Sequence, residues 1–366
     1  MTQYGYHASH EQIDPRTLLT AVQEAERAGF DAAMCSDHLT PWSERQGESG
    51  FAWAWLGAAL ATTDLSFGVV NAPGQRYHPA IVAQAIATLA QMAPGRFWAA
   101  LGSGQAISEH VTGDRWPAKP ERDARLLEAV AVIRALLAGE EVTHHGLVTV
   151  DRARVWSLPE TPPPLVGAAV TEATAVRAAG WADGLITISQ PPEQLRRLIG
   201  AYRDAGGRGE VFVQAQVSLE TTREQALAVA HDQWRTNIFE PPLSWDLDTV
   251  EHFDQVAEHV TPEAVAESVF CTADAGELVD ALHAFAECGA SRVYVHGVTK
   301  DQHAFVRRMG DEVLPRLDRG AGPGTAGSGA TGPSGVPGAT GVPEPAGAGA
   351  GSGAAAAADV PVRGGA

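Results

Sequence analysis

Short runs of β-branched or apolar residues alternate with longer stretches of helical period along most of the chain. This alternation predicts a parallel sheet covered by helices, because neighbouring parallel strands need a long crossover connection. Eight strand and helix cycles favour the α/β class and a single (β/α)8 TIM barrel over a doubly wound sheet, which usually has fewer strands. The expected strands lie near Tyr4–Tyr6, Ala32–Cys35, Leu65–Val70, Phe97–Leu101, Leu165–Ala168, Gly184–Ile188, Val211–Val217 and Arg292–Val295.

Helix signals separate these strands. Asp14 and Pro15 are a good N-cap and first-turn pair, and Gly29 is a good helix end. One weakly patterned segment, Thr221–His259, is expected to be an insertion in the barrel. Further helices are expected at Pro79–Met92, Arg122–Leu137, Pro192–Ala205 and Ala275–Cys288.

The end of the chain has a different composition. Residues 319–366 contain mostly Gly, Ala, Pro, Ser and Thr, which bury too little apolar area to offset the entropy of ordering them. We therefore expect a disordered tail at 319–366 and one barrel domain at 1–318.

The charge balance and the cysteines exclude several classes of protein. The chain has 44 acidic and 26 basic residues, a net charge of −18, and only two lysines, Lys119 and Lys300. This disfavours nucleic acid as a partner, because nucleic-acid binding needs clustered cations. Three scattered cysteines form neither a disulfide framework nor a metal motif, and no signal peptide or long apolar run occurs. A soluble cytoplasmic protein without membrane contact is expected.

Polar or small residues follow every predicted strand. In a TIM barrel the carboxyl ends of the strands meet at one face, so these residues should surround one pocket. The mixture suits an enzyme that holds a planar ligand. The residues are His7, Ser9 and His10; Ser36, Asp37, His38 and Trp42; Asn71; Gly102 to Gln105; Ala168 to Thr171; Thr187 and Ser189; Gln214 and Gln216; and His296.

Asp37 and His38 form the sharpest pair, because a histidine at a strand end can exchange a proton near neutral pH. Adjacent residues of an extended chain point in opposite directions, so the two need not pair with each other. The competing interpretation is an Asp cap beside a half-exposed histidine. The turn Gly102–Gly104 would let backbone approach a ring or a phosphate, although a simple tight turn is also compatible with it.

A metal-dependent hydrolase is a further alternative, given thirteen histidines. Such barrels usually place two histidines one residue apart after the first strand. Here His7 and His10 are three apart and should face opposite sides, so no metal site is expected. His144 and His145 are expected in a polar, hairpin-like loop rather than at a ligand site.

Several motifs resemble the luciferase-like oxidoreductase superfamily, from about Tyr4 to Leu317. Within it, the chain is most similar to the coenzyme F420-dependent glucose-6-phosphate dehydrogenases, which implies the barrel independently. The motifs are Gly5–Ser9, Ser36–His38 with Pro41–Trp42, Arg76–Pro79, Gly102–Gly104 and Trp181–Gly184.

The resemblance implies roles for particular residues. Asp37 would contact the cofactor, His38 would take the proton from a substrate alcohol, and Trp42 would form a wall over the reacting ring. Val70–Asn71 falls where the family has a non-prolyl cis peptide behind the ring. The remaining implied cofactor contacts are Gly102, Ser103, Gly104, Ser108, Val170 and Thr171.

The sequence also departs from the family pattern. Gln105 replaces a glutamate acid/base and cannot exchange a proton, so we expect it to bond the ring or the substrate. Pro191, Ser268 and Ile188 replace the residues that bind the sugar phosphate, so glucose 6-phosphate is not expected as the substrate. The expected substrate is a small, neutral organic molecule.

Two segments, Ser43–Gly47 and Asp232–Asn237, are similar to a subgroup thought to use FMN. Gln105 and the acidic charge favour FMN slightly over coenzyme F420, which has an anionic tail. The prediction is therefore a flavin- or deazaflavin-dependent oxidoreductase that transfers a hydride. A flavin-dependent monooxygenase and a flavin-binding barrel without turnover remain alternatives. Members of this family commonly form dimers, so a homodimer is possible here. Trp53 and Trp55 could lie at its interface, in the core or in the pocket wall.

Overall fold

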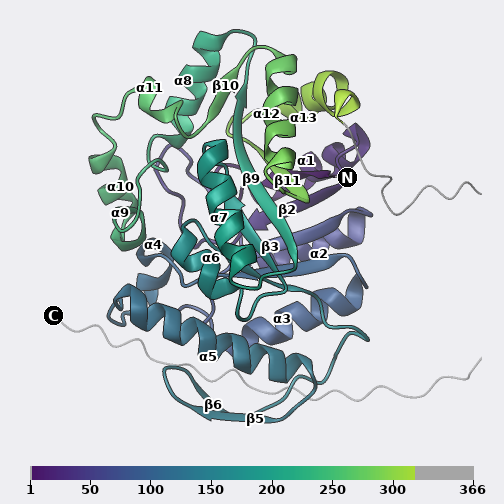
Figure 1. The fold of residues 1–366 in the computed structure, drawn as a ribbon, viewed down its shortest axis with the longest axis vertical. Coiled ribbons are helices and arrows are strands. Elements are labelled where there is room, and N and C mark those ends of the chain that lie inside the picture. Colours follow the sequence, from purple (N-terminus) through teal and green to yellow (C-terminus); the bar gives the residue numbers. More distant parts are fainter. Residues whose placement is uncertain (1, 318–366) are drawn as a thin grey trace, which may run out of the picture. The chain divides into compact units, whose positions relative to one another are not determined.

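A closed barrel of eight parallel strands forms the centre of the fold (Figure 1). The computed structural model describes residues 2–317. The strands are β1 (Gln3–Ala8), β2 (Ala32–Ser36), β3 (Ser66–Asn71), β4 (Phe97–Leu101), β7 (Leu165–Ala168), β8 (Gly184–Ile188), β9 (Glu210–Leu219) and β11 (Arg292–Gly297). Each strand pairs in parallel with two others in the order β9, β11, β1, β2, β3, β4, β7, β8, and β8 pairs again with β9. The TIM barrel expected from the sequence is confirmed.

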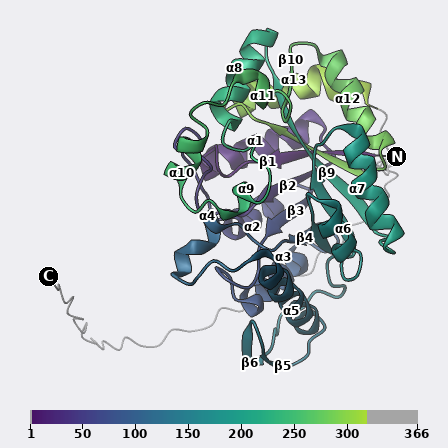
Figure 2. The ribbon, with the colours of Figure 1, turned by 60° about the vertical axis from the view of Figure 1, so that its left-hand side comes forward.

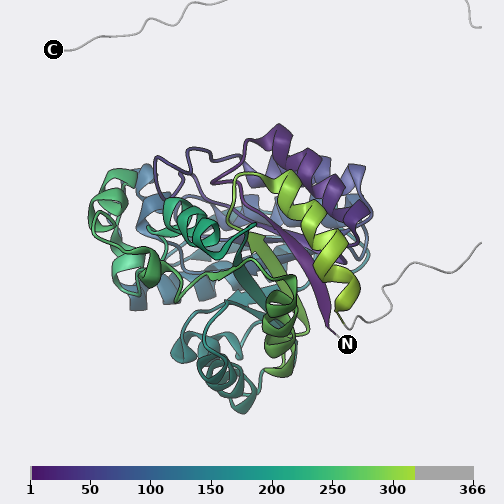
Figure 3. The same cartoon turned by 90° about the horizontal axis from the view of Figure 1, so that it is seen from above.

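Helices cover the outside of the barrel between successive strands (Figure 2). They are α1 (Pro15–Ala28), α2 (Ala52–Thr62), α3 (Pro79–Met92), α5 (Lys119–Leu137), α6 (Glu172–Ala178), α7 (Pro192–Asp204), α12 (Ala275–Glu287) and α13 (Gln302–Arg308). Helix α13 lies beside α1, so the last and first of these helices are neighbours (Figure 3). A π-helical turn (Met309–Val313) and a 3-10 turn (Leu314–Arg316) follow α13.

The segment between β9 and β11 is more structured than its weak sequence pattern suggested. It contains α8 (Arg223–Trp234), α9 (Leu243–Asp246), α10 (Val250–Val256) and α11 (Pro262–Val265), followed by strand β10 (Phe270–Thr272). Strand β10 was not expected; it pairs only with β9, outside the closed ring. The histidine-containing loop is an antiparallel hairpin of β5 (Val142–His145) and β6 (Thr149–Ala153).

Helix α1 shows how local signals set the element ends. The Asp14 carboxylate accepts hydrogen bonds from the backbone N–H groups of Arg16 and Thr17, which have no partner within the helix. Gly29 ends the helix at φ 96°, a conformation that costs glycine little. Both ends lie where the sequence predicted them.

Two apolar layers stabilise the barrel. The larger one lies between strands and helices, and a smaller cluster of aromatic and aliphatic residues fills the interior. Trp98 is part of the interior cluster and lies directly over Gly68 of β3, where a Cβ atom would be 1.9 Å from the indole. The indole therefore needs a glycine on the neighbouring strand.

Residues 2–317 all belong to one compact unit. The tail expected at residues 319–366 lies outside the described residues. Within residues 2–317, no helix is both long enough and apolar enough to cross a membrane.

Substitution of Gly68 by alanine should lower the free energy of unfolding by about 1–3 kcal/mol, because Trp98 must move away from its neighbours. Gly57, inside α2, is the matched control, since no atom lies within 4 Å of its added Cβ. Gly57→Ala should raise the stability by roughly 0.5–1 kcal/mol through helix propensity. Chemical denaturation measures both changes, and equal stability of Gly68→Ala and the wild type would contradict this account.

Candidate active site

A cavity of about 930 Å³, counted to its open mouth, lies at the carboxyl ends of the barrel strands. All of the residues to which the resemblance gives a role line it, except Trp42 and Thr171: Asp37, His38, Val70, Asn71, Gly102, Ser103, Gly104, Gln105, Ser108 and Val170. Of the other strand-end residues expected at the pocket, Ala168, Ala169, Thr187 and Gln214 line it, whereas His7, Ser9, His10, Ser36, Ser189, Gln216 and His296 do not. Closure of the barrel thus brings together residues that are far apart in the sequence.

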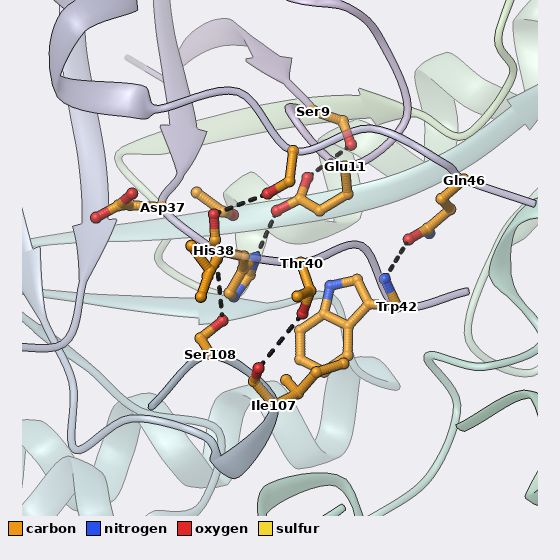
Figure 4. A network of polar contacts seen from close by, with 12 residues as sticks. Ser9, Glu11, Asp37, His38, Thr40, Trp42, Gln46, Ile107 and Ser108 are labelled. Atoms are coloured by element: carbon orange, nitrogen blue, oxygen red, sulfur yellow. Dashed lines mark hydrogen bonds and ion pairs between the residues drawn. The ribbon is translucent and has the colours of Figure 1, made fainter. Parts of the chain in front are cut away.

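His38 is paired with a carboxylate that the sequence analysis missed. Its Nδ1 lies 2.5 Å from Oε1 of Glu11, in the loop after β1, and the other carboxylate oxygen accepts a hydrogen bond from Ser9 Oγ at 2.9 Å (Figure 4). The Glu11 side chain is only 4% exposed. A glutamate directly after His10 was the available signal, but spacing alone does not say which strand-end loop faces which.

Glu11 is held in its ionised form. Burial would raise the pKa of this carboxyl, but the hydrogen bond from His38 and the charges of His38 and His7 lower the pKa well below its ordinary value. A carboxylate at Nδ1 favours the tautomer with a proton on Nδ1, which leaves Nε2 free to accept a proton. Such a pair can act as a general base with an orienting carboxylate.

Asp37 points away from His38, as expected of adjacent residues on an extended chain. Its Oδ2 accepts a hydrogen bond from Asn71 Nδ2 at 2.8 Å, and its Oδ1 accepts one from the Tyr77 hydroxyl at 3.3 Å. Arg76 donates to the Asp37 backbone oxygen at 2.6 Å and lies 3.5 Å from the carboxylate. These partners hold Asp37 at the cavity wall without drawing it toward the imidazole.

The peptide between Val70 and Asn71 is not cis, contrary to the expectation from the resemblance. Within the described residues the recorded cis bond is Pro241–Pro242. The physical reason lies in the sheet, because both residues continue β3 and pair in register with Ala100 and Leu101 of β4. The end of β3 is thus regular extended backbone.

The glycine turn after β4 brings backbone close to the cavity. Gly104 has φ +80°, and a Cβ there would lie 3.0 Å from Glu109 Cγ, so this position favours glycine. Gln105 precedes the short helix α4 (Ala106–Glu109), and Ser108 Oγ accepts a hydrogen bond from Leu39 N at 3.3 Å. The turn therefore exposes backbone rather than large side chains.

Two further polar side chains, Glu109 and Lys119, line the cavity and were not predicted from the sequence as site residues. Burial raises the pKa of Glu109, and the neighbouring Arg76 and Arg125 oppose this rise. Lys119 is one of only two lysines in the chain, but this does not indicate a site. Neither has a local motif, so the sequence offered little signal for them.

Trp42 and Thr171 lie outside the lining residues of the cavity. The Trp42 ring packs edge-on against His38, with 4.9 Å between the ring centroids (Figure 4). On another side it packs edge-on against Phe253 of α10, at 5.2 Å. It therefore supports the back of His38. Thr171 caps α6 by accepting a hydrogen bond from Thr174 N, and it lines an adjacent surface groove.

His7 and His10 contact different neighbours. The His7 ring stacks on His296 at 4.3 Å between centroids, whereas the His10 ring packs edge-on against Trp55 at 4.9 Å. Burial lowers the pKa of all three imidazoles, that of His296 to about 4. Within residues 2–317, no group of three or more His, Cys, Asp or Glu side chains is placed to hold a metal ion.

Comparisons with known proteins agree with this geometry. The family model described as luciferase-like monooxygenase matches residues 1–292. An F420-dependent glucose-6-phosphate dehydrogenase from Beutenbergia cavernae is 35% identical over 87% of this chain and 98% of its own length. A protein of the same name from Nakamurella multipartita is 34% identical over 86% and 96%.

Among solved structures, an F420-dependent secondary alcohol dehydrogenase in complex with an F420-acetone adduct has a TM-score of 0.80 and 30% identity. The match covers 87% of this chain and 99% of that one. Both the sequence and the fold therefore assign this chain to the luciferase-like monooxygenase family.

Proposed function

We propose that this protein is an oxidoreductase that transfers a hydride between a small neutral alcohol, or the corresponding ketone, and coenzyme F420 or FMN. The observation that carries this proposal is the pair of buried Glu11 and His38, with His38 on the wall of the cavity at the carboxyl ends of the strands. The names of the relatives support the same class of reaction.

The cavity residues fit a flavin-like ring. Asn71 has a buried side-chain oxygen, Oδ1, without a hydrogen-bond partner in the described part of the chain, which suits an N–H or O–H group of a ligand. Gly102 and Gly104 leave room for close approach to backbone. When bound, the cofactor would supply the ring atom that exchanges a hydride with the substrate. Asp37, Val70, Asn71, Ser103, Gly104, Ser108 and Val170 would hold it, with Thr171 at the border of the site.

His38 would act on the substrate hydroxyl. Nε2 accepts the hydroxyl proton while the carbon loses its hydride, and the Glu11 carboxylate stabilises the resulting imidazolium. Trp42, packed against the ring, restricts the rotation of His38. Gln105 lines the same cavity and would bond the ring or the substrate.

The alternatives have less support. Gln105 motivates a flavin-binding barrel without turnover, whereas the contact between His38 and Glu11 supports an enzyme with a general base. A monooxygenase would use the same cavity with FMN, whereas the relatives at 30% identity or more are named for F420. We therefore rank F420 ahead of FMN, the reverse of the order that the sequence suggested.

The substrate would not be a sugar phosphate. Ile188 lines the cavity where the dehydrogenases have a threonine, and Lys119 is the one lysine or arginine among the described lining residues. We further propose that the protein works in the cytoplasm, in line with the free thiols of Cys35, Cys271 and Cys288.

Glu11→Gln should lower turnover by about 10²- to 10⁴-fold and shift the pH profile to lower pH, because the imidazolium loses its counter-charge. Loss of F420 absorbance with small secondary alcohols measures this. The control is Glu24→Gln, since Glu24 forms an exposed pair with His303 at 2.8 Å. Wild-type turnover in Glu11→Gln would refute the role of the pair.

Titration of the purified protein with F420 and with FMN tests the cofactor. We expect a bound spectrum with F420 at micromolar concentration and weaker binding of FMN. Binding of FMN alone would move the function to the flavin branch of the family. Binding of neither would overturn the proposed function.

We also propose a homodimer that forms through the outer face of α2 and α3. Phe51 and Ile81 are 56% and 55% exposed there and line an apolar groove with Tyr77 and Leu89. Trp53 also lines this groove, whereas Trp55 is buried against His10.

Ile81→Glu should convert a dimer into a monomer, because it places a charge in an apolar contact. Light scattering after size-exclusion chromatography measures the mass. Val176→Glu, at an exposed apolar residue of α6, is the control. A wild-type monomer at micromolar concentration would contradict the proposed pairing.

A further inference from the structure

Two cations share one carboxylate beside the cavity. Asp123 forms an ion pair with the Lys119 ammonium, one turn earlier on α5, and a second with Arg177 Nη2 of α6 at 3.1 Å. The same lysine donates a hydrogen bond to Ser103 Oγ at 3.0 Å. The cluster of Lys119, Asp123 and Arg177 therefore carries one positive charge in excess, in a chain of net charge −18.

Within residues 2–317, the recorded ion pairs of Lys119 and Arg177 are both with Asp123, so a second carboxylate does not balance the excess. Arg122, on the next face of α5, has its own partner in Asp246 at 3.2 Å and so adds no net charge. Burial lowers the pKa of Lys119, and the hydrogen bond and charge of Asp123 oppose this, so the cation is held in a poorly solvated place. An anion from outside the chain would complete the charge balance.

One member of the cluster, Lys119, lines the cavity, together with Ser103, Thr174 and Trp245. The Lys119 ammonium lies over the Trp245 ring, 5.2 Å from the ring centroid. Thr174 Oγ1 accepts a hydrogen bond from Arg177 Nη2 at 3.1 Å. The Lys119 ammonium and two hydroxyl groups therefore line one part of the cavity, and the Arg177 guanidinium, which is not itself a lining group, is bonded to one of these hydroxyl groups.

We infer that Lys119, held by Asp123 and with the charge of Arg177 close by, binds the phosphoryl group of the cofactor. A phosphoryl group offers several anionic oxygens, which suits a cation and two hydroxyl donors better than a neutral group would. FMN carries a phosphate monoester and F420 a phosphate diester, so both contain this chemistry. The inference rests on the proposed function. It adds a site that would bind the charged phosphoryl group of the cofactor, separate from the residues that would hold its ring.

The acidic composition of the chain does not prevent it from binding an anionic cofactor. The chain has only two lysines, but the fold places one of them, Lys119, in the cavity wall. What matters for binding is the local charge, because distant charges at the surface are screened by salt.

Binding of FMN, F420 and riboflavin to the wild type and to Lys119→Met tests the inference, with ligand fluorescence as the readout. Riboflavin has the ring of FMN without its phosphate. Lys119→Met should raise the Kd of FMN and F420 by about 10- to 100-fold, the effect of one hydrogen bond to a charged group. The Kd of riboflavin should stay unchanged, and Arg177→Met should act in the same direction.

Lys300→Met is the matched control, because Lys300 is the other lysine of the chain and is exposed outside the cavity lining. Equal affinity of Lys119→Met and wild type for FMN and F420 would overturn the inference and leave the proposed function intact. An equal loss for riboflavin would also overturn it, since Lys119 would then only shape the cavity. A wild type that binds none of the three would refute the proposed function itself.

Discussion

Closure of the sheet between β8 and β9 is the constraint on which the rest of this structure depends. With this pairing each of the eight strands has two neighbours, and all eight carboxyl ends meet at one rim. The Glu11–His38 pair joins the loops after β1 and β2, and the glycine turn after β4 shares the cavity with His38. The pair itself joins neighbouring strands, and closure adds residues of β7, β8 and β9 to the same cavity.

Charge is distributed unevenly around this rim. The buried carboxylate of Glu11 faces an imidazole, Asp37 is held by Asn71 and Tyr77, and the excess positive charge lies at Lys119. A ligand with hydrogen-bonding ring atoms and an anionic substituent matches this pattern. His38, the proposed base, lies on the wall of the same cavity as the residues proposed to hold that ligand.

Local sequence signals predicted the elements well where they depend on neighbours in the chain. Asp14, Pro15 and Gly29 bound α1 as expected, because a cap acts within one helical turn. Strand β10 was missed because three residues are too short for a periodic pattern, and it is held only by its pairing with β9. The cis peptide expected at Val70–Asn71 came from resemblance alone, and the regular pairing of β3 with β4 contradicts it.

The amino-acid sequence by itself determined the barrel, its eight strands and the polar residues at their ends, because periodicity and turn chemistry are local properties. It also pointed to His38 and to the glycine turn. Only the tertiary structure decided that Glu11 is the partner of His38, that Trp42 lies behind it, and that Lys119 enters the cavity. These are contacts between distant segments, and they depend on which loops the closed barrel brings together.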